Sequence, residues 1–170
     1  MPRTVRTTSA CPRMVSVPSA PGRPGREPNR PSRKTIDARR PEAERRGLRI
    51  HTTLTAAPAT GDPSLAESLV ANLVDNAIRH NVPGGWVRVS TTMTDGRAII
   101  RIGNTGTVIP PYELDRLFQP FQRLGHERIR HGDGHGLGLA VVRAIATAHK
   151  AAVIATARPE GGLDLQVSFP

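Results

Sequence analysis

Four polar side chains share one face of a helix predicted in the middle of the chain. They occur in the segment LVANLVDNAIRHN at positions i, i+4, i+7 and i+8, which form one stripe: Asn72, Asn76, Arg79 and His80. Asparagine is a poor helix former, so a stripe with two of them is unusual. Amide oxygens suit a hard cation, and the positive charge one turn later suits a phosphate. The alternative is a solvated surface stripe without a ligand.

Alternating glycines precede a second predicted helix. They are Gly132, Gly134, Gly136 and Gly138 in the segment GDGHGLGLAVVRAIA. Glycine permits close backbone approach, and the free N–H groups at a helix N-terminus favour an anion. The segment lacks the Gly-Lys-Ser/Thr of a Walker loop and the Gly-x-Gly-x-x-Gly spacing of a dinucleotide site. It indicates either another kind of phosphate contact or a flexible hinge before a helix.

A third candidate is the segment RIGNTGTVIPP, in which a predicted strand runs into an Asn-Thr-Gly turn. Asn104 stands at the end of that strand and could offer its amide to the edge of a ligand. Asparagine is also common in ordinary turns, so the segment alone does not decide between the two interpretations.

The elements that position these residues follow from periodicity and turn residues. Alternation predicts strands at Leu48–Leu54, Trp86–Met93, Arg97–Ile102, Ala151–Ala157 and Leu163–Phe169. A helix is expected to begin in Asp62-Pro63-Ser64, either with Asp62 as the cap before Pro63 or with Ser64 and Glu67 as a capping box. It runs to about His80 and is ended by the breaker Asn81-Val82-Pro83-Gly84-Gly85. Further helices are expected briefly after Pro110-Pro111 and over Leu137–His149. Thr94-Asp95-Gly96 predicts a hairpin turn. The order predicts an α+β fold, a two-layer α/β sandwich with one mixed sheet and helices packed on one face.

Charge divides the chain of 170 residues, whose formal net charge is +10, into two parts. Residues 1–46 hold twelve basic and four acidic side chains and half of the 16 prolines, so we expect a disordered basic arm. Residues 47–170 form the predicted domain. No apolar run could span a membrane, no secretory signal is seen, and Cys11 is the only cysteine. These features exclude an intrachain disulfide and a cysteine zinc site, and they favour a cytoplasmic location.

Taken together and in order, the segments resemble the ATP-binding catalytic domain of bacterial sensor histidine kinases. That domain belongs to the superfamily of DNA gyrase, the heat-shock chaperone ATPase and the mismatch-repair ATPases. NLVDNAIRHN resembles the N box, GNTGTVIPP the first glycine box, LFQPFQRL the F box and GHGLGLAVVRAIA the second glycine box. Gly161-Gly162 before a strand matches the usual end of the domain. The resemblance covers about residues 48–170.

The resemblance implies ATP and Mg²⁺ as cofactors and assigns roles by position. Asn76 would hold Mg²⁺, Asn104 would stand at the adenine-recognising position, and residues 121–134 would form a lid anchored by Phe118 and Phe121. The remaining nucleotide contacts would come from Asn72, Arg79, His80, Gly106, Gly134, His135, Gly136, Leu137, Gly138 and Leu139.

Two positions depart from what the histidine kinase family usually has, and a third differs from the ATP-hydrolysing members of the superfamily. Asn104 replaces an aspartate, which predicts weaker ATP binding and poorer discrimination against GTP, because a flipped amide can donate to the guanine oxygen. Val108 replaces a glycine, which makes the turn less permissive. Asn72 stands where ATP-hydrolysing members carry a glutamate base, and an amide cannot take up a proton, so little intrinsic ATPase activity is expected.

The partners follow from the same resemblance. Residues 1–46 contain no histidine, so phosphoryl transfer is expected to need a histidine-bearing dimerisation and phosphoacceptor domain on another protein, with a response regulator engaged indirectly. A stand-alone anti-sigma-type serine kinase and a truncated ATP-binding domain without catalytic activity are the alternatives. Nucleic acid is not an expected partner, because the arm has charge but no aromatic residue to stack on bases.

Overall fold

The computed structural model describes residues 33–120 and 136–170. The helices are α1 (Arg33–Asp37), α2 (Arg40–Arg45), α3 (Pro63–Arg79) and α4 (Gly138–Ala148), with short 3₁₀ turns η1 (Pro111–Glu113) and η2 (Asp115–Phe118). The strands are β1 (Arg49–Leu54), β2 (Trp86–Thr94), β3 (Arg97–Asn104), β4 (Ala152–Ala157) and β5 (Leu163–Ser168). From β1 onward, the order predicted from the sequence is confirmed, and the element ends agree to within about two residues.

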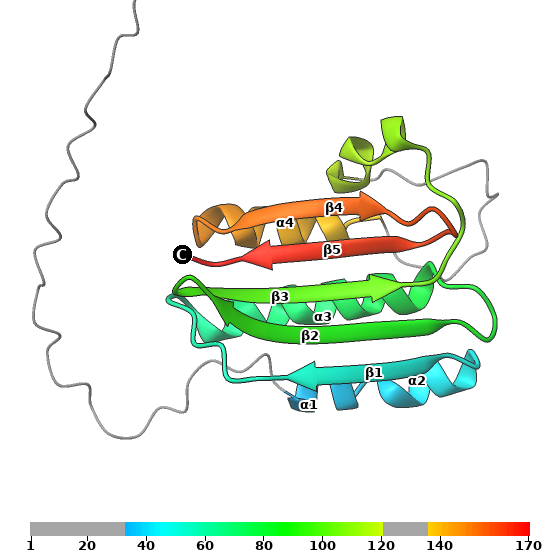
Figure 1. The fold of residues 1–170 in the computed structure, drawn as a ribbon, viewed down its shortest axis with the longest axis horizontal. Helices are drawn as coiled ribbons and strands as arrows, with labels where there is room; N and C mark the ends of the chain where they lie inside the picture. The colour runs from blue at the N-terminus through cyan, green and yellow to red at the C-terminus, as the bar shows by residue number, and fades with distance from the viewer. Residues whose placement is uncertain (1–32, 121–135) are drawn as a thin grey trace, which may run out of the picture.

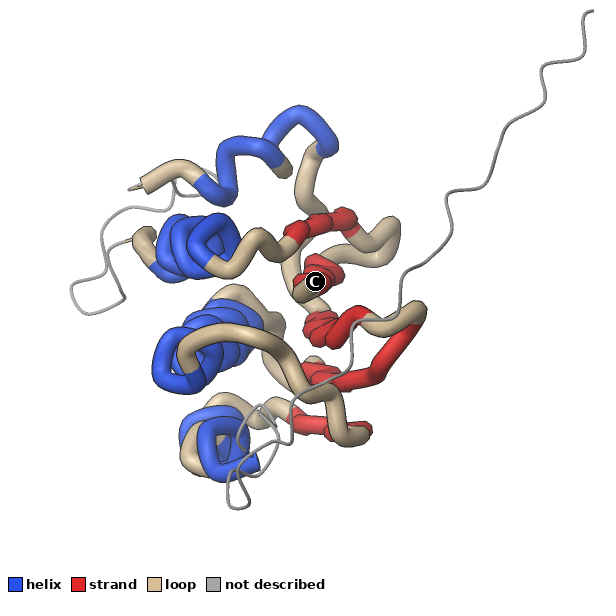
Figure 2. The backbone as a smooth tube through the Cα atoms, turned by 90° about the vertical axis from the view of Figure 1, so that its left-hand side faces the viewer, coloured by secondary structure: helices blue, strands red, loops and turns tan. Residues whose placement is uncertain are grey.

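The strands form one mixed sheet in the order β1-β2-β3-β5-β4. β1 pairs with β2 in parallel, and the other three pairings are antiparallel. α3 and α4 lie behind the strands in Figure 1, and the end-on view in Figure 2 shows helices on one side of the sheet only. The predicted two-layer architecture is therefore confirmed. Among the described residues, no helix is long and apolar enough to cross a membrane.

The core lies between the sheet and the helices α3 and α4, which pack side by side. The apolar face of α3 is buried from Leu69 onward: Leu69, Val70, Leu73, Val74, Ala77 and Ile78. Alternation along β2, β3 and β5 sends a matching set of side chains toward the helices: Val87, Val89, Ile100, Ile102, Leu165 and Val167. Because these side chains fix one face of each strand, the other face of the sheet points away from both long helices.

The turn between β2 and β3 has the conformation that the Asp-Gly pair predicts. Asp95 and Gly96 have φ values of 51° and 74°. Two successive positive φ values are typical of the tight hairpin turn whose twist matches that of the flanking strands. The turn sets the register in which Val87 pairs with Asn104, so Asn104 is the last paired residue of β3.

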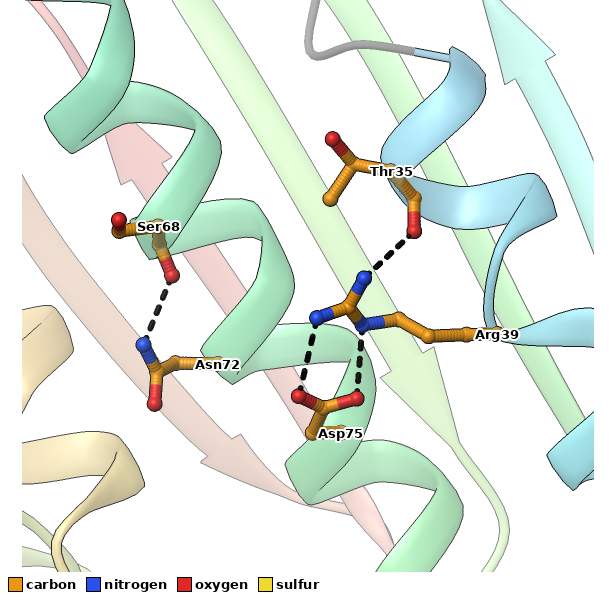
Figure 3. Close-up of polar contacts among 5 residues, drawn as sticks. All are labelled: Thr35, Arg39, Ser68, Asn72 and Asp75. Carbon is orange, nitrogen blue, oxygen red and sulfur yellow. Dashed lines mark hydrogen bonds and ion pairs between the residues drawn. The ribbon is translucent and has the colours of Figure 1, made fainter.

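The prediction of a disordered arm was wrong for residues 33–46, while residues 1–32 lie outside the described part of the chain. Ile36 on α1 is fully buried and Ala43 on α2 is 1% exposed. Arg39, between the two helices, donates to both carboxylate oxygens of Asp75 on α3, at 2.7 and 3.2 Å, and to the carbonyl of Thr35 at 2.8 Å (Figure 3). The folded part therefore begins before residue 47. The average composition of residues 1–46 did not indicate this, because only two apolar residues of α1 and α2 are buried.

We expect Ile36→Ala to lower the free energy of unfolding by about 2–4 kcal/mol, because it empties a fully enclosed site. Val108→Ala, at a side chain that is 68% exposed, serves as the control and should change it by less than about 0.5 kcal/mol. Chemical denaturation of both variants measures the effect. An Ile36→Ala variant as stable as the wild type would show that α1 does not belong to the folded domain.

Asp62, rather than Ser64, caps the N-terminus of α3. Its carboxylate accepts hydrogen bonds from the backbone N–H and the hydroxyl of Ser64, at 2.8 and 2.7 Å. These two bonds lower the pKa of Asp62 below its ordinary value of 3.8. The backbone N–H of Asp62 donates to Nε2 of His149 at 3.1 Å, which ties the start of α3 to the end of α4.

The lowered pKa of Asp62 sets the pH range in which the cap stabilises the fold. Its contribution is fully present above pH 3.8 and is lost as the pH falls through the lower folded-state pKa. Asp62→Ala should therefore lower Tm at neutral pH, and the difference from the wild type should shrink in strong acid. Glu67→Ala is the matched control, since Glu67 would matter only if Ser64 and Glu67 formed a capping box. An equal loss in both variants would contradict the assignment.

Candidate functional site

The polar stripe predicted on α3 forms one edge of the candidate site. Asn72, Asn76 and Arg79 are half-buried and His80 is exposed. The amide of Asn72 donates to the carbonyl of Ser68 at 2.8 Å, within its own helix (Figure 3). Within residues 33–120 and 136–170, the side chains of Asn76 and Arg79 make no hydrogen bond or ion pair. An amide and a cation one turn apart are therefore available to a ligand.

The N-terminus of α4 lies beside this stripe. A Cβ atom on Gly138, the first residue of α4, would lie 3.6 Å from Oδ1 of Asn72. Gly136 has a φ of 66°, which favours glycine. The backbone N–H groups of Gly138 and Leu139 fall in the first turn of the helix, where no intrahelical acceptor exists. The side chain of Leu139 is buried, whereas that of Leu137 is exposed, so Leu139 can offer a ligand only its backbone.

Part of the predicted site falls outside the described residues. Gly134 and His135 do so, together with Phe121 and the rest of the predicted lid. Phe118, the other predicted anchor, is half-buried and packs against the hydrophobic core. The described part of the site therefore consists of the α3 stripe, the start of α4 and the end of β3.

Asn104 is 4% exposed and its amide has a fixed orientation. Its Nδ2 donates to the backbone carbonyl of Thr105 at 2.8 Å, and its Oδ1 has no hydrogen-bond partner among the described residues. A flip would lose this bond and place two oxygens against each other, because a carbonyl can only accept. The side chain therefore presents an acceptor. The expectation of poorer discrimination between ATP and GTP required the Asn104 amide to flip, and the hydrogen bond to Thr105 opposes that flip.

The turn that carries Asn104 is packed too closely for side chains. A Cβ atom on Gly162 would lie 1.9 Å from the carbonyl oxygen of Asn104, and one on Gly161 would lie 2.3 Å from that of Gly106. A Cβ on Gly106 would lie 2.6 Å from the carbonyl oxygen of His80, at the end of α3. Gly106, predicted as a nucleotide contact, thus also has a packing role between the end of α3 and the turn.

Asn81, expected from the sequence only to end a helix, connects three segments. Its Nδ2 donates to the carbonyls of Ala77 and Trp86, both at 3.0 Å. Its Oδ1 accepts from the Thr105 hydroxyl at 2.7 Å and from the N–H of Val82 at 2.9 Å. The N–H of Trp86 in turn donates to the Thr105 hydroxyl at 2.8 Å. These bonds fix the end of α3 against the turn that follows Asn104. The sequence signal for this role was the position of an asparagine between the end of a helix and the segment Val-Pro-Gly-Gly.

The donors and acceptors fit a nucleotide better than a metal held by protein groups alone. Within the residues that the structure describes, no group of three His, Cys, Asp or Glu side chains could hold a metal ion. Mg²⁺ usually keeps several waters and binds one or two protein oxygens together with substrate phosphates. An amide and a guanidinium without partners in the described part of the chain, a helix N-terminus and a buried acceptor fit that chemistry.

Comparison with known proteins identifies the family. Residues 61–170 match the family described as "Histidine kinase-, DNA gyrase B-, and HSP90-like ATPase". The chain belongs to this ATPase family. It is 44% identical over 138 residues to the sensor protein CutS of Streptomyces coelicolor, which covers 81% of this chain and 33% of CutS. It is 35% identical over 119 residues to the sensor histidine kinase CusS of Escherichia coli strain K12, which covers 70% of this chain and 25% of CusS.

A solved structure of a sensor kinase is also similar to this chain. The mycobacterial sensor histidine kinase MprB matches with a TM-score of 0.67 and 30% identity, over 81% of this chain and 92% of that structure. The predicted resemblance to sensor histidine kinases is confirmed. The chain spans a third or less of the length of CutS and CusS.

Asn81→Ala should lower the free energy of unfolding by about 1–3 kcal/mol, because the Thr105 hydroxyl and the carbonyls of Ala77 and Trp86 each lose one hydrogen bond. Asn72→Ala, within α3, is the matched asparagine-to-alanine control. It removes one bond to the helix's own backbone and introduces a better helix former, so stability should change by less than about 0.5 kcal/mol. Equal losses in thermal or chemical unfolding would contradict the connecting role of Asn81.

Proposed function

We propose that this chain is the ATP-binding catalytic part of a sensor histidine kinase. It binds Mg·ATP and donates the γ-phosphoryl group to a histidine on a separate phosphoacceptor domain. The observation that carries the proposal is the juxtaposition of the α4 N-terminus with a stripe whose Asn76 and Arg79 have no partner among the described residues. The names of CutS and CusS, a sensor protein and a sensor histidine kinase, support the same role.

Each part of the site contributes a different interaction. Asn76 holds Mg²⁺ through its amide oxygen, and Arg79 with the N–H groups of Gly138 and Leu139 neutralises phosphate charge. Asn104 accepts a hydrogen bond from the adenine amino group, and His80 flanks the nucleotide. When bound, Mg·ATP supplies the γ-phosphoryl group that the imidazole attacks. The protein acts by positioning and charge neutralisation, which dominate catalysis of phosphoryl transfer.

Neither the amide of Asn72 nor the carboxylate of Asp75, the two groups near Asn76, is suited to activate water. Asn72 cannot accept a proton, and its Nδ2 is bonded to Ser68. Asp75 neighbours Asn76 in sequence, but both of its oxygens are bonded to Arg39 from the N-terminal segment (Figure 3). We therefore expect slow ATP hydrolysis when no phosphoacceptor is present.

The serine-kinase alternative has less support. Anti-sigma-type kinases usually carry a glutamate at the position of Asn72 and a carboxylate in the first glycine box, where this chain has Asn104. An ATP-binding domain without catalytic activity is the other alternative. The response regulator is engaged only through the phosphorylated histidine.

The proposal is tested by mixing the full chain with γ-labelled ATP, Mg²⁺ and the separately purified phosphoacceptor domain of a CutS-like kinase. We expect acid-labile label on the acceptor, reduced about 10–100-fold by Asn76→Ala. Arg143→Gln, at an exposed position on α4, is the control and should transfer normally. Acid-stable label would indicate a serine kinase. ATP binding without transfer would indicate an inactive domain, and rapid hydrolysis without acceptor would contradict the assignment of Asn72.

Nucleotide preference tests the orientation of Asn104. Because the Thr105 carbonyl holds Nδ2, the wild type should bind ATP more tightly than GTP. Asn104→Asp supplies a charged acceptor and should strengthen ATP binding by about 1 kcal/mol, roughly fivefold, without improving GTP binding. Calorimetric titration of both nucleotides measures this. Equal affinity of the wild type for ATP and GTP would show that the amide flips or does not contact the base.

A further inference from the structure

The sheet face opposite α3 and α4 carries an unbalanced set of charges. This face is turned toward the viewer in Figure 1, and no helix of the described residues lies on it in Figure 2. Alternation along the strands sends Arg49, Arg88 and Arg101 to this face. Asp164 on β5 is the acidic residue that points the same way. The open face therefore has an excess of arginine.

A hollow of about 340 Å³ lies on this face, across β2, β3, β5 and β4. Gly103 lies in its floor, paired with Arg88 on one side and Asp164 on the other. A Cβ atom on Gly103 would lie 2.2 Å from the carboxylate of Asp164, and the absence of a side chain at this position leaves the hollow open. Trp86 and Arg101 border the hollow from β2 and β3.

The charges around the hollow do not cancel. Asp164 accepts from Arg158 at 3.0 Å, and the same guanidinium contacts Glu160 at 3.3 Å. Arg88 has no carboxylate partner in the described part of the chain, and Arg101 bonds only the neutral Gln166, at 2.8 Å. Arg88 and Arg101 are diagonal neighbours across β2 and β3, a relation that sets Cβ atoms about 7–8 Å apart. Two uncompensated guanidinium groups thus face the same space.

The surroundings of Trp86 favour carboxylates over nucleic-acid bases. The guanidinium carbons of Arg88 and Arg158 lie 4.7 and 4.8 Å from the centre of its ring. A ring in contact with two guanidinium groups is a poor platform for stacking a base. Stacking also holds an arginine in place while leaving its N–H edge free, which suits a carboxylate. Residues 1–32 hold six arginines and one glutamate, so the chain's own N-terminal sequence has the wrong charge for this face.

We propose that the open sheet face binds an acidic segment of a partner protein, with Arg88 and Arg101 contacting its carboxylates. The surface is separate from the candidate nucleotide site, which lies at the helical layer and the end of β3. The proposal therefore stands independently of ATP binding.

The test uses the fluorescence of Trp86, the only tryptophan of the chain and a residue of the hollow itself. The full chain is titrated, without nucleotide, with an end-blocked octapeptide of glutamate and with its glutamine counterpart. We expect saturable binding of the glutamate peptide, weakened by salt, and no binding of the glutamine peptide. Arg88→Gln and Arg101→Gln should each weaken binding by roughly threefold to fivefold, read from the midpoint of the titration.

Arg143→Gln is the matched control, because it removes the same charge from the helical layer and should leave the affinity unchanged. An equal loss in this variant would show a general charge effect and overturn the proposal. Tighter binding of an eight-nucleotide single-stranded thymidine oligomer than of the glutamate peptide would also overturn it, in favour of nucleic acid. If a variant unfolds, the wild-type salt dependence decides, since binding that is unaffected by salt contradicts carboxylate recognition.

Discussion

The candidate site depends on the close packing of one turn. Residues 104–106 lie between the carbonyl end of α3 and the pair Gly161-Gly162, at distances that leave no space for a Cβ atom. Both glycines of the pair also have φ values near +100°, a conformation that favours glycine. Asn81 and Thr105 complete the arrangement with hydrogen bonds to the start of β2. Because backbone packs directly on backbone, the position of Asn104 relative to α3 is fixed by the fold and not by flexible side chains.

Helix α3 separates three tasks by direction. Its apolar face packs in the core, Asn72 of its polar stripe lies beside the start of α4, and Asp75 points to the N-terminal segment, where Arg39 binds it (Figure 3). The ion pair occupies the carboxylate nearest in sequence to Asn76. This arrangement leaves an amide, without a free carboxylate beside it, at the proposed metal position. It accords with a domain that holds a nucleotide for an external nucleophile.

Local patterns were sufficient to predict the fold, because it depends on signals within a few residues. Periodicity identified α3 and the strands, and Asp95-Gly96 identified the hairpin. Average composition failed at residues 33–46, where the buried side chains of Ile36 and Ala43 and the ion pair of Arg39 with Asp75 anchor two short helices. The stripe of Asn72, Asn76 and Arg79 followed from helical spacing. The bond that orients Asn104 joins neighbouring residues, but it forms only in the particular backbone conformation of the turn, which residue types do not specify. The bond between Asn81 and Thr105 joins segments 24 residues apart, whose closeness in space no local pattern contains. The sequence therefore indicated which residues form the candidate site, but not which of their atoms are free.

The most direct test of this account is a crystal structure of the chain with Mg²⁺ and a non-hydrolysable ATP analogue. The account predicts the adenine amino group within hydrogen-bond distance of Oδ1 of Asn104. It also predicts Mg²⁺ on the amide oxygen of Asn76 and phosphates against the first turn of α4. A nucleotide bound elsewhere, a metal ion on Asp75 in place of Asn76, or an Asn104 amide turned away from Thr105 would contradict it.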